Sequence, residues 1–273
     1  MKDDSPAALL DFTRSLARLA IPMAQRPVDR ASLARKADSS TVTSTDRGIQ
    51  RLLVERIRES YPDHAIIAEE EQEESSDNLA APARTEARFC WVLDPLDGTR
   101  NYAAGIPCYS ISLAVLDRGH PVAAVIAEPN VHHLYAVADS SEGTVNAAPL
   151  RARDPDSKYA ALVGFTSNRD SKSVAVFTHW IRARGIVLRN FGSTALQLAL
   201  VASGALNATF SRKCKIWDIA AGALLVRQAG GVVTTAEGQP LLPFDLSLDP
   251  EANLPILAAA PQTHQRLLAM ILA

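Results

Sequence analysis

Four acidic residues of this chain lie where a folded backbone would hold their side chains in place. Glu69 and Asp94 each follow a short apolar run, and Asp97 comes three residues after Asp94. Asp218 lies near the start of the apolar segment I-W-D-I-A-A-G-A-L-L-V. Carboxylates at strand ends and helix starts can converge on a hard divalent cation, which prefers several oxygen ligands on rigid supports.

The stretch W-V-L-D-P-L-D-G-T-R-N-Y places Gly98 and Thr99 directly after two of these acids. If a helix begins there, its first N–H groups form an anion site, and glycine lets a phosphate approach the backbone closely. Metal-binding acids beside such a site predict metal-assisted transfer of a phosphoryl group to water. The ordinary alternatives are a structural Asp turn and, for Asp218, a helix cap.

The elements that would carry these residues follow from hydrophobic spacing and end signals. A first helix is expected from Pro6 to about Ala24, and Thr45, with Asp46 in the first turn, is expected to open a second. After the strand that ends at Asp94, runs rich in Val and Ile predict hairpin-like sheet as far as residue 138.

From about Tyr159 strands and helices alternate, which is typical of an α/β arrangement. Strands are expected at 161–165, 186–190, 205–210, 231–235 and 255–259, and helices at 171–184, 193–203, 217–229 and 261–272. The sequence therefore predicts an N-terminal α+β half over residues 1–150 with most of the acids, and a C-terminal α/β half over 151–273 with Asp218. Residues 151–158 are the expected joint.

The composition is that of a globular protein: 273 residues, 47% hydrophobic, 21% charged and a formal net charge of −2. This balance predicts neither a nucleic-acid partner nor a membrane surface. The N-terminus lacks the basic and apolar regions of a signal peptide. Cys90, Cys108 and Cys214 are widely spaced, so reduced thiols and a cytoplasmic location are expected.

Three segments, I-I-A-E-E (66–70), the stretch 91–102 and K-I-W-D-I-A-A-G-A-L-L-V-R-Q-A-G-G (215–231), resemble the signatures of the inositol monophosphatase family. The resemblance runs from about Leu10 to the C-terminus. It implies a five-layer α-β-α-β-α sandwich, dependence on Mg²⁺, inhibition by Li⁺ and a homodimer. It also implies a small phosphorylated alcohol as substrate.

The resemblance also implies a ligand set for two or three Mg²⁺ ions. Glu69, Asp94 and the Leu96 carbonyl would hold one ion, and Asp94, Asp97 and Asp218 would hold a second. A third ion near Glu69 would help to activate water.

Other roles carry over from the same motifs. Thr99, with Asp46 as its partner, would orient the attacking water, and the Gly98 and Thr99 amides would bind the phosphate. Asp97 would reach the substrate hydroxyl beside the ester. Lys36 resembles a lysine of the family's mobile loop, although a solvent-exposed lysine explains it equally well.

Substrate choice is less determined. Ser193 and Thr194, in G-S-T-A-L, would contact the alcohol. Animal inositol phosphatases have a carboxylate where Ser211 aligns here, so myo-inositol phosphate is in doubt. Lys215, in the basic segment before Asp218, would favour a second negative group on the substrate, or is simply solvated. Related enzymes act on histidinol phosphate, fructose 1,6-bisphosphate or 3'-phosphoadenosine 5'-phosphate, and these three esters are the alternative substrates.

Two other classes of protein compete with this interpretation. D-P-L-D-G-T superficially resembles the D-x-D-G-T motif of haloacid-dehalogenase-type phosphatases, but the acids are spaced differently and lie in the middle of the chain. A calcium-binding loop starting at Asp94 would need Glu at its twelfth position, which here is Gly105. A non-catalytic metal-binding homologue is the remaining alternative.

Overall fold

The computed structural model describes residues 3–28, 34–35, 41–70, 83–166 and 170–272. Its helices are α1 (Pro6–Ala24), α2 (Ser44–Ser60), α3 (Thr99–Ala104), α4 (Ser171–Arg182), α5 (Thr194–Ala202), α6 (Ile216–Gln228) and α7 (Pro261–Leu272), with one 3-10 turn at Pro129–Val131. None of the helices in these ranges is both long and apolar enough to cross a membrane.

Within the described residues, the strands form two large sheets and one small one. The seven-stranded sheet has the order β3 (Ala65–Ala68), β4 (Phe89–Asp97), β5 (Ser110–Asp117), β6 (His120–Glu128), β7 (His133–Ala138), β8 (Thr144–Val145) and β9 (Ala148–Pro149). The five-stranded sheet has the order β11 (Ile186–Arg189), β10 (Ala161–Phe165), β12 (Ala208–Ser211), β14 (Ile256–Ala259) and β13 (Val232–Thr234). The small sheet pairs β1 (Ala34–Arg35) with β2 (Thr41–Val42).

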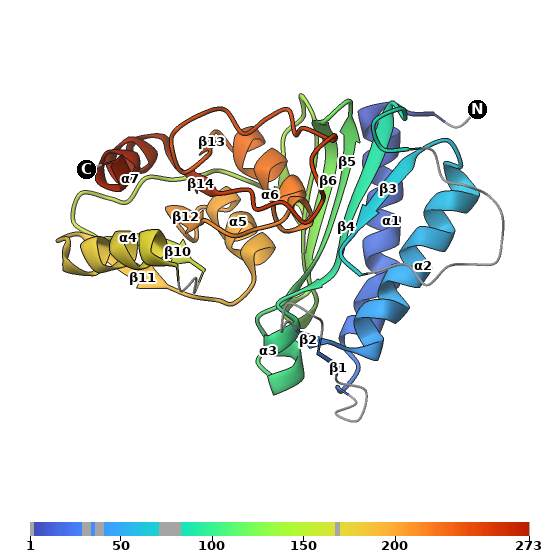
Figure 1. Ribbon diagram of the computed structural model, residues 1–273, viewed down its shortest axis with the longest axis horizontal. Helices are drawn as coiled ribbons and strands as arrows, with labels where there is room; N and C mark the ends of the chain where they lie inside the picture. The colour runs from blue at the N-terminus through green and yellow to red at the C-terminus, as the bar shows by residue number, and fades with distance from the viewer. Residues whose placement is uncertain (1–2, 29–33, 36–40, 71–82, 167–169, 273) are drawn as a thin grey trace.

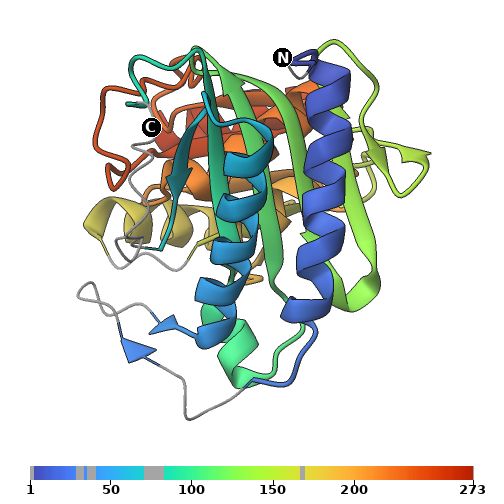
Figure 2. The same cartoon turned by 90° about the vertical axis from the view of Figure 1, so that its right-hand side faces the viewer.

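Helices and sheets stack alternately in five layers. Helices α1 and α2 cover the outer face of the seven-stranded sheet, where they lie side by side (Figure 2). Helices α5 and α6 fill the space between the two large sheets, and α4 and α7 cover the far face of the five-stranded sheet (Figure 1). The predicted α-β-α-β-α sandwich is therefore confirmed.

The start of α2 differs slightly from the prediction. The N-cap is Thr43 rather than Thr45, because the Thr43 hydroxyl accepts hydrogen bonds from the amides of Thr45 and Asp46. The Asp46 carboxylate in turn accepts a hydrogen bond from the Thr43 amide at 2.8 Å. This reciprocal capping box fixes the Asp46 side chain at the first turn of α2.

The seven-stranded sheet explains how Asp94 and Asp97 are placed. Strand β3 runs parallel to β4, whereas β4, β5, β6 and β7 are successively antiparallel, as the hairpin-like pattern predicts. The β4–β5 register shifts between Asp94 and Asp97, at Pro95, which has no N–H to donate to the ladder. Asp94 still pairs with Ser112 and Asp97 with Ser110, so the irregularity inserts one extra residue of β4 between the two acids.

The five-stranded sheet is mixed. Strand β10 runs parallel to β11 and β12, whereas β14 is antiparallel to β12 and β13. The predicted alternation of strands and helices is confirmed, with shifted boundaries. The strand expected at 205–210 forms at Ala208–Ser211, because the Leu206 amide still bonds back to the Leu200 carbonyl at 3.0 Å.

Candidate metal and phosphate site

Three carboxylates from two distant parts of the sequence meet at one place. Asp94 and Asp97, at the end of β4, and Asp218, in the first turn of α6, each offer a carboxylate oxygen, and these oxygens all lie within 4.8 Å of one another. Residues 94 and 218 are far apart in the chain, so only the stacking of α6 on the sheet brings them together. The predicted convergence of these three acids is present in the structure.

The Asp94 side chain is fixed by its own turn. Only 1% of the residue is exposed, and its Oδ1 accepts a hydrogen bond from the Leu96 amide at 3.0 Å. This bond occupies one lone pair of the carboxylate and holds the side chain in a single orientation. Asp94 therefore behaves as a rigid, buried donor of carboxylate oxygen.

Asp97 links the end of β4 to the start of α5. Its Oδ2 accepts hydrogen bonds from Ser193 Oγ and from the Ala195 amide, each at 2.6 Å. Ser193 is the N-cap of α5 and Thr194 is the first residue of that helix; both are buried. A carboxylate at a helix N-terminus is stabilised by the exposed amides there.

Asp218 is held by the residue that precedes α6. Its Oδ2 accepts a hydrogen bond from the Lys215 amide at 2.7 Å, which completes the first turn of the helix. The Lys215 ammonium group donates to the Glu251 carbonyl and lies 3.4 Å from a Glu251 carboxylate oxygen. The Lys215 side chain is thus tied to the loop before β14.

Burial and mutual repulsion disfavour the charged forms of these acids. Burial, and then the charges of Glu69 and Asp97, raise the pKa of Asp94 well above its usual range. Burial, and then the charge of Asp97, do the same to the pKa of Asp218. Burial raises the pKa of Asp97 to about 7, against the opposing hydrogen bonds from Ser193 and Ala195. A cation held between them would relieve this repulsion, and an oxygen-only donor set suits a hard cation, so the cluster can hold a metal ion.

Glu69 lies beside this cluster rather than inside it. It follows β3, and its amide donates to the Leu93 carbonyl at 3.2 Å, which extends the pairing with β4 by one residue. Its carboxylate hydrogen-bonds with Asp94. The structure therefore brings all four acids singled out in the sequence to one site.

Thr99 and Asp46 form a second polar pair next to the carboxylates. The Thr99 hydroxyl lies 3.0 Å from Asp46 Oδ1 and 3.0 Å from the Leu96 carbonyl oxygen, facing two acceptors. Burial raises the pKa of Asp46, while hydrogen bonds from Thr43 and Thr99 oppose that shift. The pairing expected from the sequence is present, and it links α2 to the turn after β4.

Gly98 occupies a position that only glycine fits. Its φ is +95°, and an added Cβ would lie 3.0 Å from the Cys108 carbonyl oxygen and 3.2 Å from Ser193 Cβ. The short helix α3 begins at the next residue, as expected if the turn is to present its amides. A side chain here would both strain the backbone and push apart the walls of the site.

Ser211 and Lys36 are the remaining candidates from the sequence. Ser211 ends β12 and is buried, and its hydroxyl accepts a hydrogen bond from the Lys213 amide at 3.4 Å. Lys36 lies outside the described residues. The sequence analysis did not single out Asn101. Its Nδ2 donates to the Cys108 and Phe191 carbonyls, each at 2.6 Å. Its position three residues after Gly98 is the signal that could have pointed to it.

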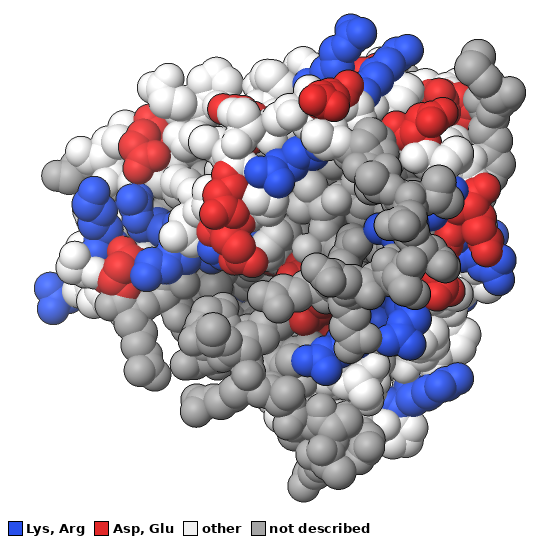
Figure 3. Space-filling view, turned by 45° about the vertical axis from the view of Figure 1, so that its right-hand side comes forward, with Lys and Arg blue, Asp and Glu red and all other residues white. Residues whose placement is uncertain are grey.

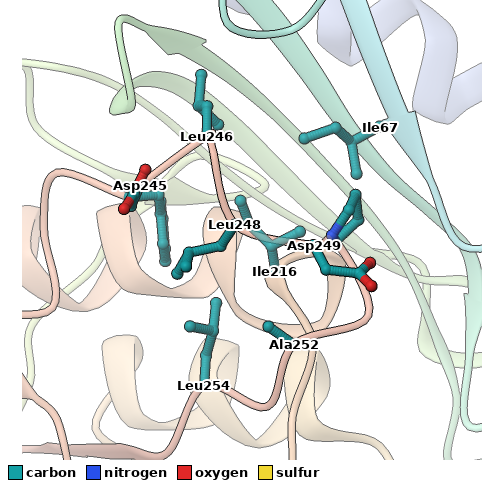
Figure 4. A pocket seen from close by; sticks show the side chains of 10 residues that line it. Ile67, Ile216, Asp245, Leu246, Leu248, Asp249, Ala252 and Leu254 are labelled. Atoms are coloured by element: carbon teal, nitrogen blue, oxygen red, sulfur yellow. The ribbon is translucent and has the colours of Figure 1, made fainter.

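A pocket with a largely apolar lining includes residues that are close in sequence to two of the acids. Ile67, two residues before Glu69, and Ile216, two residues before Asp218, line it together with the segment 244–254 (Figure 4). The Arg84 guanidinium donates to the Leu246 and Leu248 carbonyls of that segment at 2.9 and 3.1 Å. None of the four acids of the site is among the residues that line this pocket.

Comparison with known proteins agrees with this geometry. The model of the inositol monophosphatase family matches residues 6–272. This chain belongs to the inositol monophosphatase family. The Nus factor SuhB of Escherichia coli K12 is 34% identical over 219 residues, which cover 77% of each chain. The inositol-1-monophosphatase of Synechocystis is 33% identical over 234 residues, covering 83% of this chain and 75% of the relative.

Solved structures of family members share the fold. The Thermotoga maritima IMPase superposes with a TM-score of 0.79 at 27% identity and covers 96% of each chain. Mycobacterium tuberculosis SuhB has a TM-score of 0.75 at 29% identity and covers 99% of this chain and 98% of its own. The haloacid-dehalogenase-type alternative is excluded by the family match.

Proposed function

We propose that this protein is a Mg²⁺-dependent hydrolase of a small phosphate monoester. The observation that carries the proposal is the convergence of Asp94, Asp97 and Asp218 within 4.8 Å, beside the paired Thr99 and Asp46. Acidic side chains held this close together without a cation repel one another and destabilise the fold, whereas a two-cation phosphatase needs such a group.

The ligand assignments follow the positions in the site. Asp94 is central and would serve two cations, one shared with Glu69 and the Leu96 carbonyl, the other with Asp97 and Asp218. A third cation would lie near Glu69. Bound Mg²⁺ would supply charge for the phosphate oxygens and make a water molecule acidic enough to attack near neutral pH.

The chain's own groups would orient the reactants. Because the Thr99 hydroxyl hydrogen faces Asp46 and the Leu96 carbonyl, its lone pairs are available to accept a hydrogen bond from the attacking water. The amides of Gly98 and Thr99 would donate to the phosphate. Asp97 and Ser193 would face the alcohol side of the ester, with Thr194 next to them.

The substrate is a phosphorylated alcohol of undetermined kind. Inositol phosphate is the model suggested by the family, while histidinol phosphate, fructose 1,6-bisphosphate and 3'-phosphoadenosine 5'-phosphate are the alternatives. Ser211 offers a hydroxyl where a carboxylate would be expected to bind inositol hydroxyls. Lys215 would contact a second negative group of the substrate only by giving up its ion pair with Glu251. Inhibition by Li⁺, a homodimer and a cytoplasmic location complete the proposal.

Phosphate release from these four esters, with and without Mg²⁺, tests the proposal. We expect Mg²⁺-dependent turnover of at least one ester and more than 100-fold loss in Asp94→Asn. Turnover that is independent of Mg²⁺, or an Asp94→Asn variant that keeps over half of its activity, would contradict it. A Lys215→Ala variant with equal rate losses on every ester would assign Lys215 to the support of the 244–254 segment.

A second candidate function comes from the names of the relatives and from the local charge. Several relatives are named Nus factor SuhB, although the net charge predicts no nucleic-acid partner. No Asp or Glu occurs between Asp170 and Asp218, whereas Lys or Arg occurs seven times there, at positions 172, 182, 184, 189, 212, 213 and 215. Figure 3 shows Lys and Arg side chains gathered at the left of that view, with acidic side chains nearby. We infer that a polyanion such as RNA would bind through the exposed basic residues of this stretch, which include Lys172, Arg182 and Arg184.

Fluorescence anisotropy with a labelled single-stranded RNA tests this candidate. Lys172, Arg182 and Arg184 are exposed, so their combined replacement by Gln should weaken binding and flatten its dependence on salt. Replacing the exposed Arg18 and Arg47, on α1 and α2, is the matched control. Equal affinities of the two variants would reject this surface.

A further inference from the structure

A buried glutamine makes two hydrogen bonds to the backbone of the residue after Glu69. Gln50, on α2, is 5% exposed. Its Nε2 donates to the Glu70 carbonyl at 2.7 Å, and its Oε1 accepts from the Glu70 amide at 3.0 Å. One side-chain amide thus satisfies both backbone polar groups of a single residue, as a neighbouring strand would.

The location of this contact explains why a side chain is needed there. Strand β3 is the first strand of its sheet and ends at Ala68, and the Glu69 amide makes the next bond, to Leu93. Beyond Glu69, the Glu70 peptide is paired with Gln50 instead of with a strand. Buried backbone groups are nearly always paired, so Gln50 decides where the chain leaves the sheet.

The same helix face also holds the other side of the site. Asp46 lies four residues before Gln50, one turn earlier on α2, and is buried. It accepts the hydrogen bond from Thr99 at 3.0 Å. One turn of α2 therefore contacts the segment after β4 through Asp46, and the next turn contacts the segment after β3 through Gln50. Both segments adjoin acids of the site.

We propose that Gln50 is a positioning residue that sets the place of the Glu69 carboxylate for cation binding. The inference rests on the proposed metal-dependent function, because Glu69 matters only if it helps to hold a cation. Its basis is the two-point contact, which holds both the N–H and the carbonyl of Glu70, the residue that follows Glu69. Partners that orient a metal ligand without touching the metal commonly change metal affinity about 10- to 100-fold when they are removed.

Binding of Mn²⁺, followed by the loss of the electron paramagnetic resonance signal of the free ion, is the direct test. We expect Gln50→Leu to raise the Kd for Mn²⁺ at least tenfold, and to raise the half-activating Mg²⁺ concentration similarly. The KM for the ester at saturating Mg²⁺ should change less than twofold. Gln50→Glu keeps an acceptor for the Glu70 amide but loses the donor, so its Kd should be intermediate.

Gln25→Leu is the matched control. Gln25 also donates through Nε2 to a backbone carbonyl at 2.8 Å, but that carbonyl belongs to Pro129, in the turn between β6 and β7, which carries none of the proposed ligands. Mn²⁺ affinity within twofold of the unmodified protein in both Gln50→Leu and Gln50→Glu would overturn the inference. If Gln50→Leu does not fold, Gln50→Glu still decides. A protein that hydrolyses no ester would refute the proposed function alone, since the Mn²⁺ titration needs no turnover.

Discussion

Asp97 Oδ2 lies 2.6 Å from Ser193 Oγ, and this contact joins the strand that carries two acids to the helix that begins the opposite wall of the site. Ser193 Oγ also accepts a hydrogen bond from the Leu196 amide at 3.2 Å, as the N-cap of α5. One hydroxyl therefore serves the start of a helix and the orientation of a carboxylate.

Replacing Ser193 with Ala should affect stability and activity together. Loss of an N-cap costs about 1 kcal/mol, and the buried Asp97 oxygen would lose a donor. We expect a roughly tenfold lower kcat/KM, together with a lower free energy of unfolding in urea. Ser5→Ala is the control, because Ser5 caps α1 in the same way, with Ala8 N at 3.3 Å, far from the acids. A similar loss of activity in Ser5→Ala would mean that destabilisation alone explains the Ser193 result.

Replacing Asp94 with Asn should separate catalysis from stability. In the metal-free protein the buried carboxylate is repelled by Glu69 and Asp97, so removing its charge should leave the melting temperature equal or higher. Added Mg²⁺ should raise the melting temperature of the unmodified protein, because a ligand that binds only the folded state stabilises it. The variant should show little of this rise. A variant that melts well below the metal-free unmodified protein would show that Asp94 is structural.

His64 should make stability depend on pH below neutrality. Its Nδ1 accepts a hydrogen bond from Trp91 Nε1 at 3.1 Å, and burial lowers its pKa from 6.5, although Asp4 opposes the shift. The unfolded chain therefore binds a proton at a higher pH than the folded one, so stability falls as the pH falls below about 6.5. Urea unfolding of His64→Phe at saturating Mg²⁺ should show a shallower decline between pH 7.5 and 5.5. The same decline in both proteins would exclude His64 as its source.

The sequence anticipated the parts of the site that depend on local pattern. Asp94, Asp97 and Thr99 belong to one motif, and a short helix does begin at Thr99. Asp218 was singled out by its place near the start of an apolar helix, and the resemblance to the family added Asp46 as the partner of Thr99. Contacts between side chain and distant backbone were not anticipated. The Lys215 ammonium reaches Glu251, 36 residues away, and Gln50 reaches Glu70, 20 residues away. Such pairs depend on how layers dock, which hydrophobic spacing does not encode.

Replacing Gly98 with Ala should lower activity more than replacing Gly105, at the other end of α3, with Ala. Both Gly98 and Gly105, which flank α3, have left-handed backbone, with φ of +95° and +74°. Alanine costs on the order of 1 kcal/mol in this conformation at either position. At Gly105 nothing lies within 4 Å of an added Cβ, whereas at Gly98 the Cys108 carbonyl oxygen and Ser193 Cβ are 3.0 and 3.2 Å away.

The backbone cost is therefore shared by the two variants, and only Gly98→Ala adds a clash between the walls of the site. The backbone cost should lower the free energy of unfolding by a similar small amount in both variants. The clash should lower it further in Gly98→Ala. The kcat/KM of Gly98→Ala should fall more than 100-fold, while that of Gly105→Ala should stay within threefold. Steady-state kinetics at saturating Mg²⁺ measure this difference. Equal kinetic losses would mean that the left-handed turns, rather than the close approach at Gly98, determine activity.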